Sequence, residues 1–494
     1  KLLGKTVMNH IESLDIIASE QYGGRKNKSS IMLALNKVLN FDHIRTMKVI
    51  AALCSNDLAS CYDRIIHSLT GLILLIKGVP APPIVCMLST IQNLEHSIRM
   101  SFGDSALTYG GDTWLVPLPN LATGNLLEGP LQGVGQGNGA GPMMWAVIST
   151  PILEMMREAG FGSFFKASIS GEQIRIVGYA FVDDTDLMQS ARNPTDNFLD
   201  VADYMQQGLT LFEGLMNAAG QCISPEKSLW YLVSFEWKNG NYSYSSIEQA
   251  PADVQVKDKQ GVMQTLQRLE PHESRRSLGV YSAPDGNSKD QVAILRATAE
   301  NWCEKIRVGR LPQTEAWLAL TTRIMKTIEY PLPACTLTER QCDFIMAPII
   351  QTALNALGIC RNLARDVVYG PKKFQGLGLK HPYTTMGIAH IRFIMEHCRA
   401  DTDLGNFFWI NLECLKLEVG VGGSILSNRF QDYCVLATHG IVKHTWQFLA
   451  EHKMFLYDNV SDLVLRRERD TFLIDALRRR GFKGKALRRL NLCR

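Results

Sequence analysis

Two adjacent acidic residues between two apolar runs constrain the fold of this chain more than any other feature. Asp183 and Asp184 lie in the segment GYAFVDDTDL, which predicts a strand over 173–182, a turn, and a second strand from Leu187. Neighbouring carboxylates at a hairpin tip repel each other and resist burial unless a cation neutralises them. The pair therefore predicts a site for a divalent cation, and Mg²⁺ matches carboxylate oxygens best.

A third carboxylate, that of Asp57, has a similar setting. It follows the apolar run 49–54, which predicts a buried strand with this residue at its carboxyl end. Three carboxylates at the ends of neighbouring strands can hold two metal ions roughly 3.5–4 Å apart. The alternative is an ordinary turn at 183–184 and an ordinary helix cap at Asp57, because short motifs often occur without a function.

Three segments that contain or lie between these acids resemble the palm motifs of reverse transcriptases. Segment 57–63 (DLASCYD) resembles the first motif, with an aromatic residue five positions after the catalytic Asp. Segment 133–142 (GVGQGNGAGP) resembles the second, a glycine-rich turn that leads into a helix. Segment 181–184 (FVDD) resembles the third.

Further segments follow the order of the same family. Segment 219–228 (AGQCISPEKS) resembles the fourth motif, and 277–280 (SLGV) resembles the short block of non-LTR enzymes where the primer grip lies. Segment 20–29 (EQYGGRKNKS) resembles a fingers motif, and 375–379 (QGLGL) is similar to the region after the palm. The chain thus resembles the reverse transcriptases of non-LTR retrotransposons over residues 20–280.

The resemblance implies a role for each matched residue. Two Mg²⁺ ions, or Mn²⁺ in their place, would be held by Asp57, the Leu58 carbonyl, Asp183 and Asp184. The incoming nucleotide would meet Tyr62 under its sugar, Arg25 at its phosphates and Lys227 at the leaving pyrophosphate. Gln136 and Gly137 would contact the nucleotide and the templating base, and Leu278 and Gly279 would grip the primer. The alternatives are a core aromatic at Tyr62 and an ordinary surface lysine at Lys227.

Two positions depart from the family pattern. Val182 stands where the third motif usually has a small residue, and Gly141 stands where the second motif usually has Ser before Pro. Neither change removes a catalytic group. Both are expected to affect rate or fidelity.

The implied fold is α+β: a right-hand polymerase palm, with an antiparallel sheet backed by helices, followed by a mostly α-helical thumb and C-terminal region. The predicted parts are partial fingers (1–48), palm with inserted fingers elements (49–285), helical thumb (286–390), and a helical C-terminal connection with a basic tail (391–494). Local signals agree with this order. Ser29 or Ser30 can cap a helix over 29–48, Asn239-Gly240 predicts a hairpin turn, and Ser288 can cap the first thumb helix.

The implied reaction is template-directed addition of deoxynucleotides to a DNA 3′-end. Its partners would be an RNA template, a DNA primer or target, and deoxynucleoside triphosphates. One alternative is an RNA-dependent RNA polymerase, although such enzymes commonly have Gly before the two Asp and lack an aromatic residue at the position of Tyr62. The other is an inactive, domesticated nucleic-acid-binding protein, against which the three intact acids argue.

Charge is concentrated near the end of the chain. Residues 461–494 carry eleven Lys/Arg and four Asp/Glu, a net of +7, whereas the whole chain has +4, which leaves the remainder at −3. A basic tail beside a neutral body indicates a polyanionic partner. The tail is expected to present Arg478, Arg479 and Arg480 to phosphates, opposite an apolar stripe of Phe472, Leu473, Ala476 and Leu477; a merely solvated helix face is the alternative.

The remaining composition favours an intracellular protein. The twelve cysteines form no CxxC pair, which predicts reduced thiols and no structural zinc. No apolar run is long enough to span a bilayer, and no secretory signal is recognisable. The retroelement resemblance favours the nucleus over the cytoplasm. Because few residues precede the first palm strand, we expect a piece of a longer protein that lacks part of the fingers.

Overall fold

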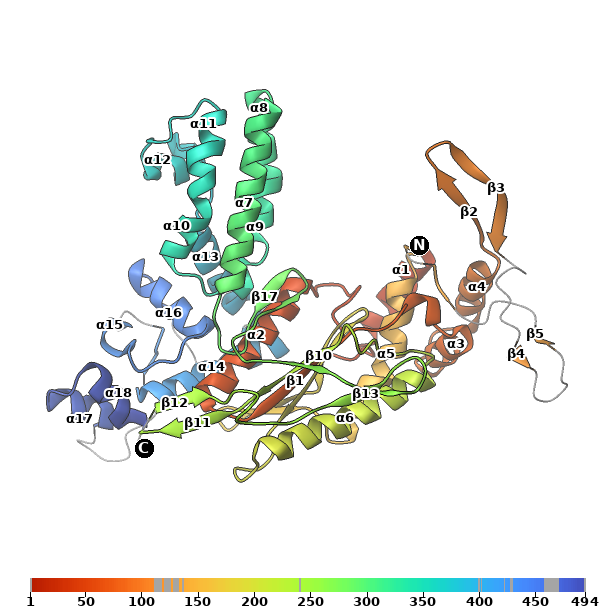
Figure 1. The fold of residues 1–494 in the computed structure, drawn as a ribbon, viewed down its shortest axis with the longest axis horizontal. Coiled ribbons are helices and arrows are strands. Elements are labelled where there is room, and N and C mark those ends of the chain that lie inside the picture. Colours follow the sequence, from red (N-terminus) through yellow and green to blue (C-terminus); the bar gives the residue numbers. More distant parts are fainter. Residues whose placement is uncertain are drawn as a thin grey trace.

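The computed structural model describes residues 2–110, 118–119, 126–127, 133–135, 137–239, 241–398, 400, 402–421, 423–426, 430–456 and 471–492. A five-stranded sheet with the order β15-β10-β1-β9-β8 lies at its centre (Figure 1). Its strands are β1 (Ala51–Asn56), β8 (Gly178–Phe181), β9 (Asp184–Ser190), β10 (Leu229–Val233) and β15 (Gln267–Leu269). The pairing is antiparallel as predicted, except that the edge strand β15 runs parallel to β10.

Helices cover both faces of this sheet. Side chains alternate along β1, so that Ala52 and Cys54 join the core under α5 (Gly141–Glu158) and α6 (Phe198–Ala218). Ala51 and Leu53 point to the opposite face, which packs on α2 (Ser30–Met47). The predicted cap is confirmed, since the Ser29 side chain accepts a hydrogen bond from the Met32 amide. The mixed helix-and-strand composition predicted from the sequence is likewise confirmed.

One end of the molecule carries short helices and a projecting hairpin (Figure 1). The elements there are α1 (Leu2–Ser13), α3 (His67–Ile76), α4 (Ala81–Gln92), β2 (Glu95–Met100), β3 (Gly103–Gly110), β4 (Leu118–Pro119) and β5 (Leu126–Leu127). α1 packs against α4 and α5, and α3 against α4 and α5. This end therefore rests on α5, which follows the glycine-rich turn.

A separate group of helices rises from the other side of the sheet (Figure 1). This helical upright consists of α7 (Lys289–Gly309), α8 (Gln313–Ala319), α9 (Met325–Glu329), α10 (Glu339–Pro348), α11 (Leu354–Ala356) and α12 (Arg365–Tyr369). It has its own core, centred on residues such as Leu295, Leu320 and Ile345. Ser288 precedes α7, but its side chain makes no capping hydrogen bond.

The C-terminal helices pack beside α2. They are α13 (Pro382–His397), α14 (Asp403–Val419), α15 (Phe430–Tyr433), α16 (Ile441–Glu451), α17 (Leu473–Arg479) and α18 (Gly484–Leu492). The Phe165 and Phe407 rings, 4.7 Å apart, join this core to the hairpin of β6 (Ser163–Lys166) and β7 (Gln173–Ile176). Two expectations need correction. The boundary predicted at residue 390 falls inside α13, and the strand predicted over 173–182 is divided, because β7 pairs with β6 whereas β8 pairs with β9.

Three hairpins extend from the sheet region: β11 (Phe235–Lys238) with β12 (Asn241–Tyr244), β13 (Gln255–Lys257) with β14 (Met263–Thr265), and β16 (Arg275–Ser277) with β17 (Val280–Ser282). The eleven cysteines within the described residues are free thiols. Among the helices described, none has the length and apolar character needed to cross a membrane.

Candidate functional site

The pairing of β1 with β9 places the predicted acids at one edge of the sheet. Asn56 lies opposite Thr185, so Asp57, the next residue after β1, continues alongside Asp184, the first residue of β9. Phe181 pairs with Asp184, which leaves Val182 and Asp183 as the two-residue loop of the β8–β9 hairpin. The structure therefore brings Asp57 beside two carboxylates that lie more than a hundred residues later in the sequence.

The electrostatics of this edge are unbalanced. Partial burial, followed by the negative charges of Asp183, Asp186 and Asp57, raises the pKa of Asp184 to about 6. The cation of Lys37 acts in the opposite direction but does not restore the ordinary value. Negative charge in excess of the local positive charge is the condition under which a bound cation lowers the energy of a carboxylate cluster.

A buried ion pair lies directly behind the acids. The ammonium group of Lys37 on α2 is 2.8 Å from Asp186 Oδ2, and the two side chains are 3% and 7% exposed. Asp186 lies two residues after Asp184, on the same face of β9. Removal of one partner would leave an uncompensated buried charge. The pair thus ties α2 to β9 of the β8–β9 hairpin, and no local sequence signal linked these residues, which are separated by 149 positions.

The fourth motif meets the first at Asp57. Lys227 Nζ lies 3.5 Å from Asp57 Oδ2, and the Ser228 hydroxyl accepts a hydrogen bond from the Asp57 amide at 3.2 Å. The Ser224 amide donates to the Asp57 carbonyl at 2.8 Å. The Lys227 side chain is 65% exposed, so it remains able to follow a phosphate group. This contact places the predicted Lys227 beside the predicted metal ligands.

The donor set suits a hard divalent cation. It offers three carboxylates and the backbone carbonyl of Leu58. The hydrogen bonds of the β-bridge between Leu58 and Ile223 are made by the backbone groups of their neighbours and do not use the Leu58 carbonyl. Within the described residues, no three His, Cys, Asp or Glu side chains already stand in a metal-binding arrangement, and Asp57 is paired with Lys227 instead. The residues fit Mg²⁺ by oxygen chemistry and by their uncompensated charge.

The tip of the β8–β9 hairpin is held from behind. Val182 has φ +59°, a region that a β-branched residue rarely adopts. The buried Gln21 side chain accepts hydrogen bonds from the Val182 amide (3.3 Å) and from the Gly23 amide (2.9 Å), and the Trp145 indole donates to the Val182 carbonyl. A Cβ on Gly23 would lie 2.6 Å from Val182 Cγ2, so Gly23 provides the space that this valine needs. The segment around Gln21, matched as a fingers motif, thus supports the hairpin.

The Tyr62 ring lies beside Gly141, the first residue of α5. A Cβ on Gly141 would be 2.9 Å from Tyr62 Cε1 and 3.1 Å from Cδ1, so only glycine lets the ring occupy this position without a shift. Burial, followed by the charges of Cys61 and Asp183, raises the pKa of Tyr62 to about 12. The half-buried ring is thus close to both Asp183 and the glycine-rich turn. Gly141, a departure from the family pattern, has a direct structural reason.

The glycine-rich turn is attached to the backbone of the first motif. Gly133 and Val134 donate to the carbonyls of Ile65 and Tyr62, each at 2.8 Å. Gly137 has φ +94°, and a Cβ there would have no neighbour within 4 Å, so its backbone faces open space. Gln136, the other nucleotide-binding residue predicted in this turn, lies outside the described residues.

The predicted primer-grip residues form the tight turn between β16 and β17. Leu278 and Gly279 have φ +50° and +86°, as a two-residue hairpin turn with two positive angles requires. The Tyr330 hydroxyl donates to the Leu278 carbonyl at 2.7 Å and lies 2.9 Å from the Ser30 hydroxyl. The turn is thereby fixed between the helical upright and the start of α2.

Arg25 does not face the acids. Its guanidinium is 2.9 Å from Glu12 Oε1, it donates to the carbonyls of Ala18 and Gln21, and its side chain is 7% exposed. In this arrangement Arg25 fastens α1 to the loop that carries Gln21. Its predicted phosphate contact remains a prediction that requires this ion pair to open.

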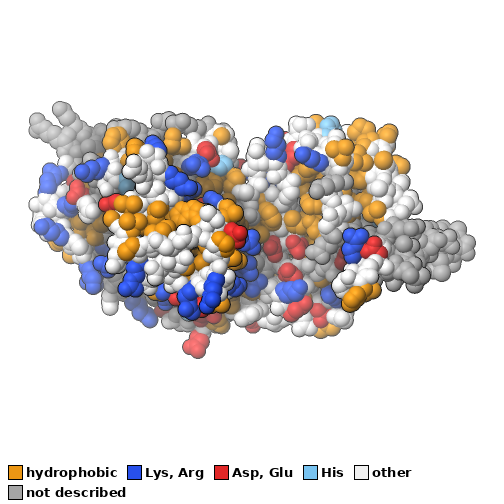
Figure 2. All heavy atoms as spheres, turned by 90° about the horizontal axis from the view of Figure 1, so that it is seen from above, with side chains coloured by type: hydrophobic (Ala, Val, Ile, Leu, Met, Phe, Trp, Pro, Cys, Tyr) orange, Lys and Arg blue, Asp and Glu red, His pale blue; other side chains and the backbone are white. Residues whose placement is uncertain are grey.

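A groove of about 600 Å³ adjoins the β16–β17 turn and the base of the helical upright. Its lining includes the cations Arg276, Arg323 and Lys326 and the hydroxyls of Thr298 and Thr322. A π-helical turn at Leu320–Ile324 sets the side chains of this wall. Cations and hydroxyls of this kind are the usual partners of a phosphodiester backbone. Figure 2, which looks down on the molecule from above, shows acidic side chains between its two halves.

Sequence comparisons and structure comparisons with known proteins give different results for this chain. No family model matches the sequence, and no curated protein sequence matches it. Telomerase from Candida tropicalis in complex with a TWJ fragment of telomeric RNA overlaps with a TM-score of 0.32 at 11% identity, over 83% of this chain and 56% of that chain. The corresponding complex from Candida albicans gives 0.31 at 9% identity, over 83% and 58%, and apo telomerase from Candida tropicalis gives 0.27 at 10%, over 83% and 59%.

This chain therefore spans less than two thirds of the length of these telomerase chains. An overlap at such TM-scores specifies neither a site nor a reaction. The function proposed below rests on the residues and contacts described above.

Proposed function

We propose that this chain is an RNA-directed DNA polymerase of the non-LTR retroelement kind. The observation that carries the proposal is the meeting of four separate motifs at one sheet edge: Asp57 beside the Asp183–Asp184 hairpin, Lys227 at 3.5 Å from Asp57, and Tyr62 against Gly141. None of these contacts follows from a single local sequence pattern. Their order along the chain and their convergence in space both suit template-directed nucleotidyl transfer.

The acids supply the reaction centre in this proposal. Asp57, Asp183, Asp184 and the Leu58 carbonyl would hold two Mg²⁺ ions, which lower the pKa of the primer 3′-hydroxyl and neutralise the triphosphate when bound. Lys227 leaves Asp57 and moves to the pyrophosphate, where its ammonium group holds or protonates the leaving oxygen. The Lys37–Asp186 pair keeps β9 in place beneath the acids.

Other residues select and position the substrates. Tyr62 lies under the sugar and excludes a 2′-hydroxyl by contact, and the open backbone at Gly137 meets the nucleotide. The turn at Leu278–Gly279 holds the primer end, and the groove that contains Arg276, Arg323 and Lys326 holds the nucleic-acid backbone. RNA template, DNA primer, deoxynucleoside triphosphates and a nuclear location are parts of the same proposal.

A four-way incorporation assay tests the proposal. The purified chain is given an RNA or a DNA template with an annealed DNA primer, and either deoxynucleotides or ribonucleotides, in Mg²⁺. The proposal predicts deoxynucleotide addition on the RNA template. Ribonucleotide addition alone would indicate an RNA-dependent RNA polymerase instead, and template binding without synthesis under any condition would indicate an inactive protein that retains the fold.

A further inference from the structure

The β11–β12 hairpin carries aromatic residues along one face. Phe235 lies opposite Tyr244, and Trp237 lies opposite Tyr242, so all four side chains project from the same side of the ribbon. The ring centroids of the two pairs are 5.3 Å and 5.9 Å apart. The Tyr242 and Tyr244 rings meet edge to face at 6.4 Å. The result is a continuous aromatic surface.

The aromatic surface is partly buried where the hairpin leaves the sheet and is exposed near the hairpin turn. Phe235 and Tyr244 pack at the margin of the core formed by the sheet and α2. Trp237 is 52% exposed, and among the tryptophans that the structure describes it alone exposes more than a third of its surface. A large ring left half in water adds little to folding, because only buried apolar area stabilises the fold. The Trp237 ring is therefore accessible for stacking on a ligand.

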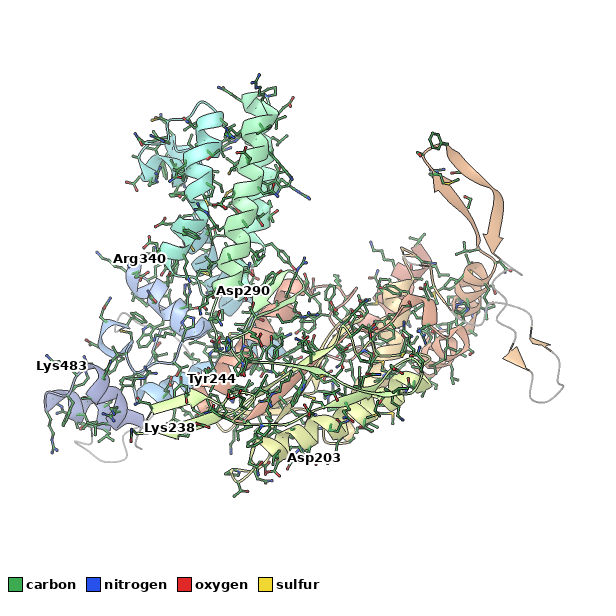
Figure 3. The ribbon with its side chains drawn as sticks, viewed as in Figure 1. Asp203, Lys238, Tyr244, Asp290, Arg340 and Lys483 are labelled. Atoms are coloured by element: carbon green, nitrogen blue, oxygen red, sulfur yellow. The ribbon has the colours of Figure 1, made fainter. Side chains whose placement is uncertain are left out.

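Cations surround the open tip. Lys48 Nζ lies 4.3 Å from the centroid of the Tyr242 ring, and Arg489 on α18 donates to the Asn239 carbonyl in the hairpin turn at 3.0 Å. α18 also carries Lys485 and Arg488, both exposed. Burial, together with the charges of Arg488 and Arg45, lowers the pKa of Lys48 to about 8 despite the attraction of Glu418. Figure 3 labels Lys238, Tyr244 and Lys483 at this same end of the molecule.

Positive charge is in excess here. Glu236 lies 3.3 Å from Lys238, and Glu418 lies 3.9 Å from Lys48. Lys485, Arg488 and Arg489 make no ion pair with any residue that the structure describes. Figure 2 shows Lys and Arg side chains gathered at the end where α17 and α18 lie.

The tail prediction is corrected in part. Arg478 is not turned toward a ligand, because it binds Asp432 at 3.1 Å and covers the Tyr433 ring at 4.8 Å. The buried residue of α17 is Ile474, whereas Leu473, expected in the apolar stripe, is exposed. Arg479 and Arg480 remain exposed as predicted, and the exposed cations beside the hairpin are those of α18.

We propose that the hairpin patch, defined as Trp237, Tyr242, Lys485, Arg488 and Arg489, binds single-stranded nucleic acid. Unpaired bases stack on the Trp237 and Tyr242 rings, and the phosphates contact the α18 cations. A duplex does not fit this chemistry, because its base faces are already stacked.

The hairpin patch is distinct from the acidic edge. Ala51, at the start of β1, pairs with Val233, and the hairpin leaves the sheet two residues later, whereas Asp57 follows the other end of β1. A six-residue strand separates the two sites by roughly 20 Å. The inference therefore holds whether or not the acids catalyse polymerisation.

Fluorescence anisotropy on the full chain tests the inference. A labelled twelve-nucleotide oligouridylate or oligodeoxythymidylate is titrated while a saturating unlabelled primer–template hybrid occupies the groove beside the helical upright. Trp237→Ala should weaken binding about 5- to 100-fold, the range expected for loss of one stacked base. Arg488→Ala/Arg489→Ala should also weaken it and lower the salt slope by roughly 1.4. Trp237→Ala should leave that slope unchanged.

The controls use matched residues away from the patch. In one control the exposed Phe374 is changed to Ala. In a second control the exposed Lys257 and Lys259 are both changed to Ala. These variants should bind like the wild type. Tighter binding of the RNA or of the DNA strand identifies the natural source of the ligand. Unchanged affinity in Trp237→Ala, or equal competition by a blunt duplex, would overturn the inference.

Discussion

Tyr62 and Gly141 define the site at the level of single atoms. The motif comparison alone predicts an effect on rate or fidelity at position 141, where a serine is usual. The 2.9 Å separation between a hypothetical Cβ and the ring shows instead that the glycine is matched to the tyrosine. In the proposed function, the position of this ring beside Asp183 would set the room available to a nucleotide sugar.

Substitution of Tyr62 should change sugar selection. In Tyr62→Ala the ring is removed and a ribose 2′-hydroxyl finds room, so ribonucleotide incorporation relative to deoxynucleotide should rise roughly tenfold or more. Tyr62→Phe keeps the ring and should keep the ratio. Gly141→Ser should alter the ratio as well, since the new Cβ displaces the ring. Equal ratios in wild type and Tyr62→Ala would make Tyr62 a core residue only.

His43 gives the fold a dependence on pH. Its ring is buried against Phe165 at 4.9 Å, and burial lowers its pKa to about 4. Because the folded pKa lies below the unfolded value of about 6.5, its contribution to stability is present above pH 6.5 and is lost as the pH falls toward 4. At pH 5 the loss amounts to about 2 kcal/mol.

The test compares apparent melting temperatures at pH 7.5 and pH 5. His43→Leu should narrow the gap between them, whereas His10→Leu, at an exposed position, should not. If both variants keep the wild-type gap, the His43 imidazole does not stay neutral in the folded protein.

At the scale of elements, the β8–β9 hairpin depends on a segment far away in the sequence. Gln21 forms an isolated parallel bridge with Ala180, and its side chain satisfies the Val182 and Gly23 amides. Its amide nitrogen donates to the Ser149 hydroxyl at 3.1 Å. One side chain thus joins α5, the loop before α2 and the tip that carries the acids.

Gln21→Ala should therefore damage both stability and synthesis. Two backbone amides lose their acceptor in a buried place, which costs roughly 1–3 kcal/mol for each unsatisfied group. The hairpin tip should also lose its fixed position, and DNA synthesis should fall at least tenfold. Gln207→Ala on the exposed face of α6 serves as the control. Wild-type melting and wild-type rates in Gln21→Ala would contradict the assigned role.

Helix starts and turns were predictable where neighbouring side chains in the sequence determine them. The Ser29 cap, the Asn239 turn (φ +53°) and the helix after Pro142 follow from side-chain chemistry within a few residues. The division of the strand predicted over 173–182 did not follow, since both halves are apolar and only the choice of partner separates them. The role of Gln21 was missed for the same reason, because its partners Ser149 and Val182 lie more than 120 positions away.

At the scale of the whole molecule, the helical upright and the opposite end stand on either side of the central sheet (Figure 1). The grouping of the acids was predictable, because Asp57 directly follows an apolar strand and Asp183 and Asp184 lie at the tip of a hairpin. The Lys37–Asp186 pair behind them and the Lys227–Asp57 contact could not be read from spacing. They depend on how α2 and the 224–228 loop pack, which only the assembled fold decides.

The central claim is that these carboxylates carry a metal-dependent polymerase reaction. The most direct test is the initial rate of deoxynucleotide addition on an RNA template in Mg²⁺, with Asp183→Asn compared with Asp203→Asn on the solvent face of α6 (Figure 3). Asp183→Asn should lose on the order of a thousandfold or more in rate while template binding stays nearly intact, because binding rests on phosphate contacts elsewhere. Asp203→Asn should match the wild type. Substantial Mg²⁺-dependent synthesis by Asp183→Asn would contradict the account.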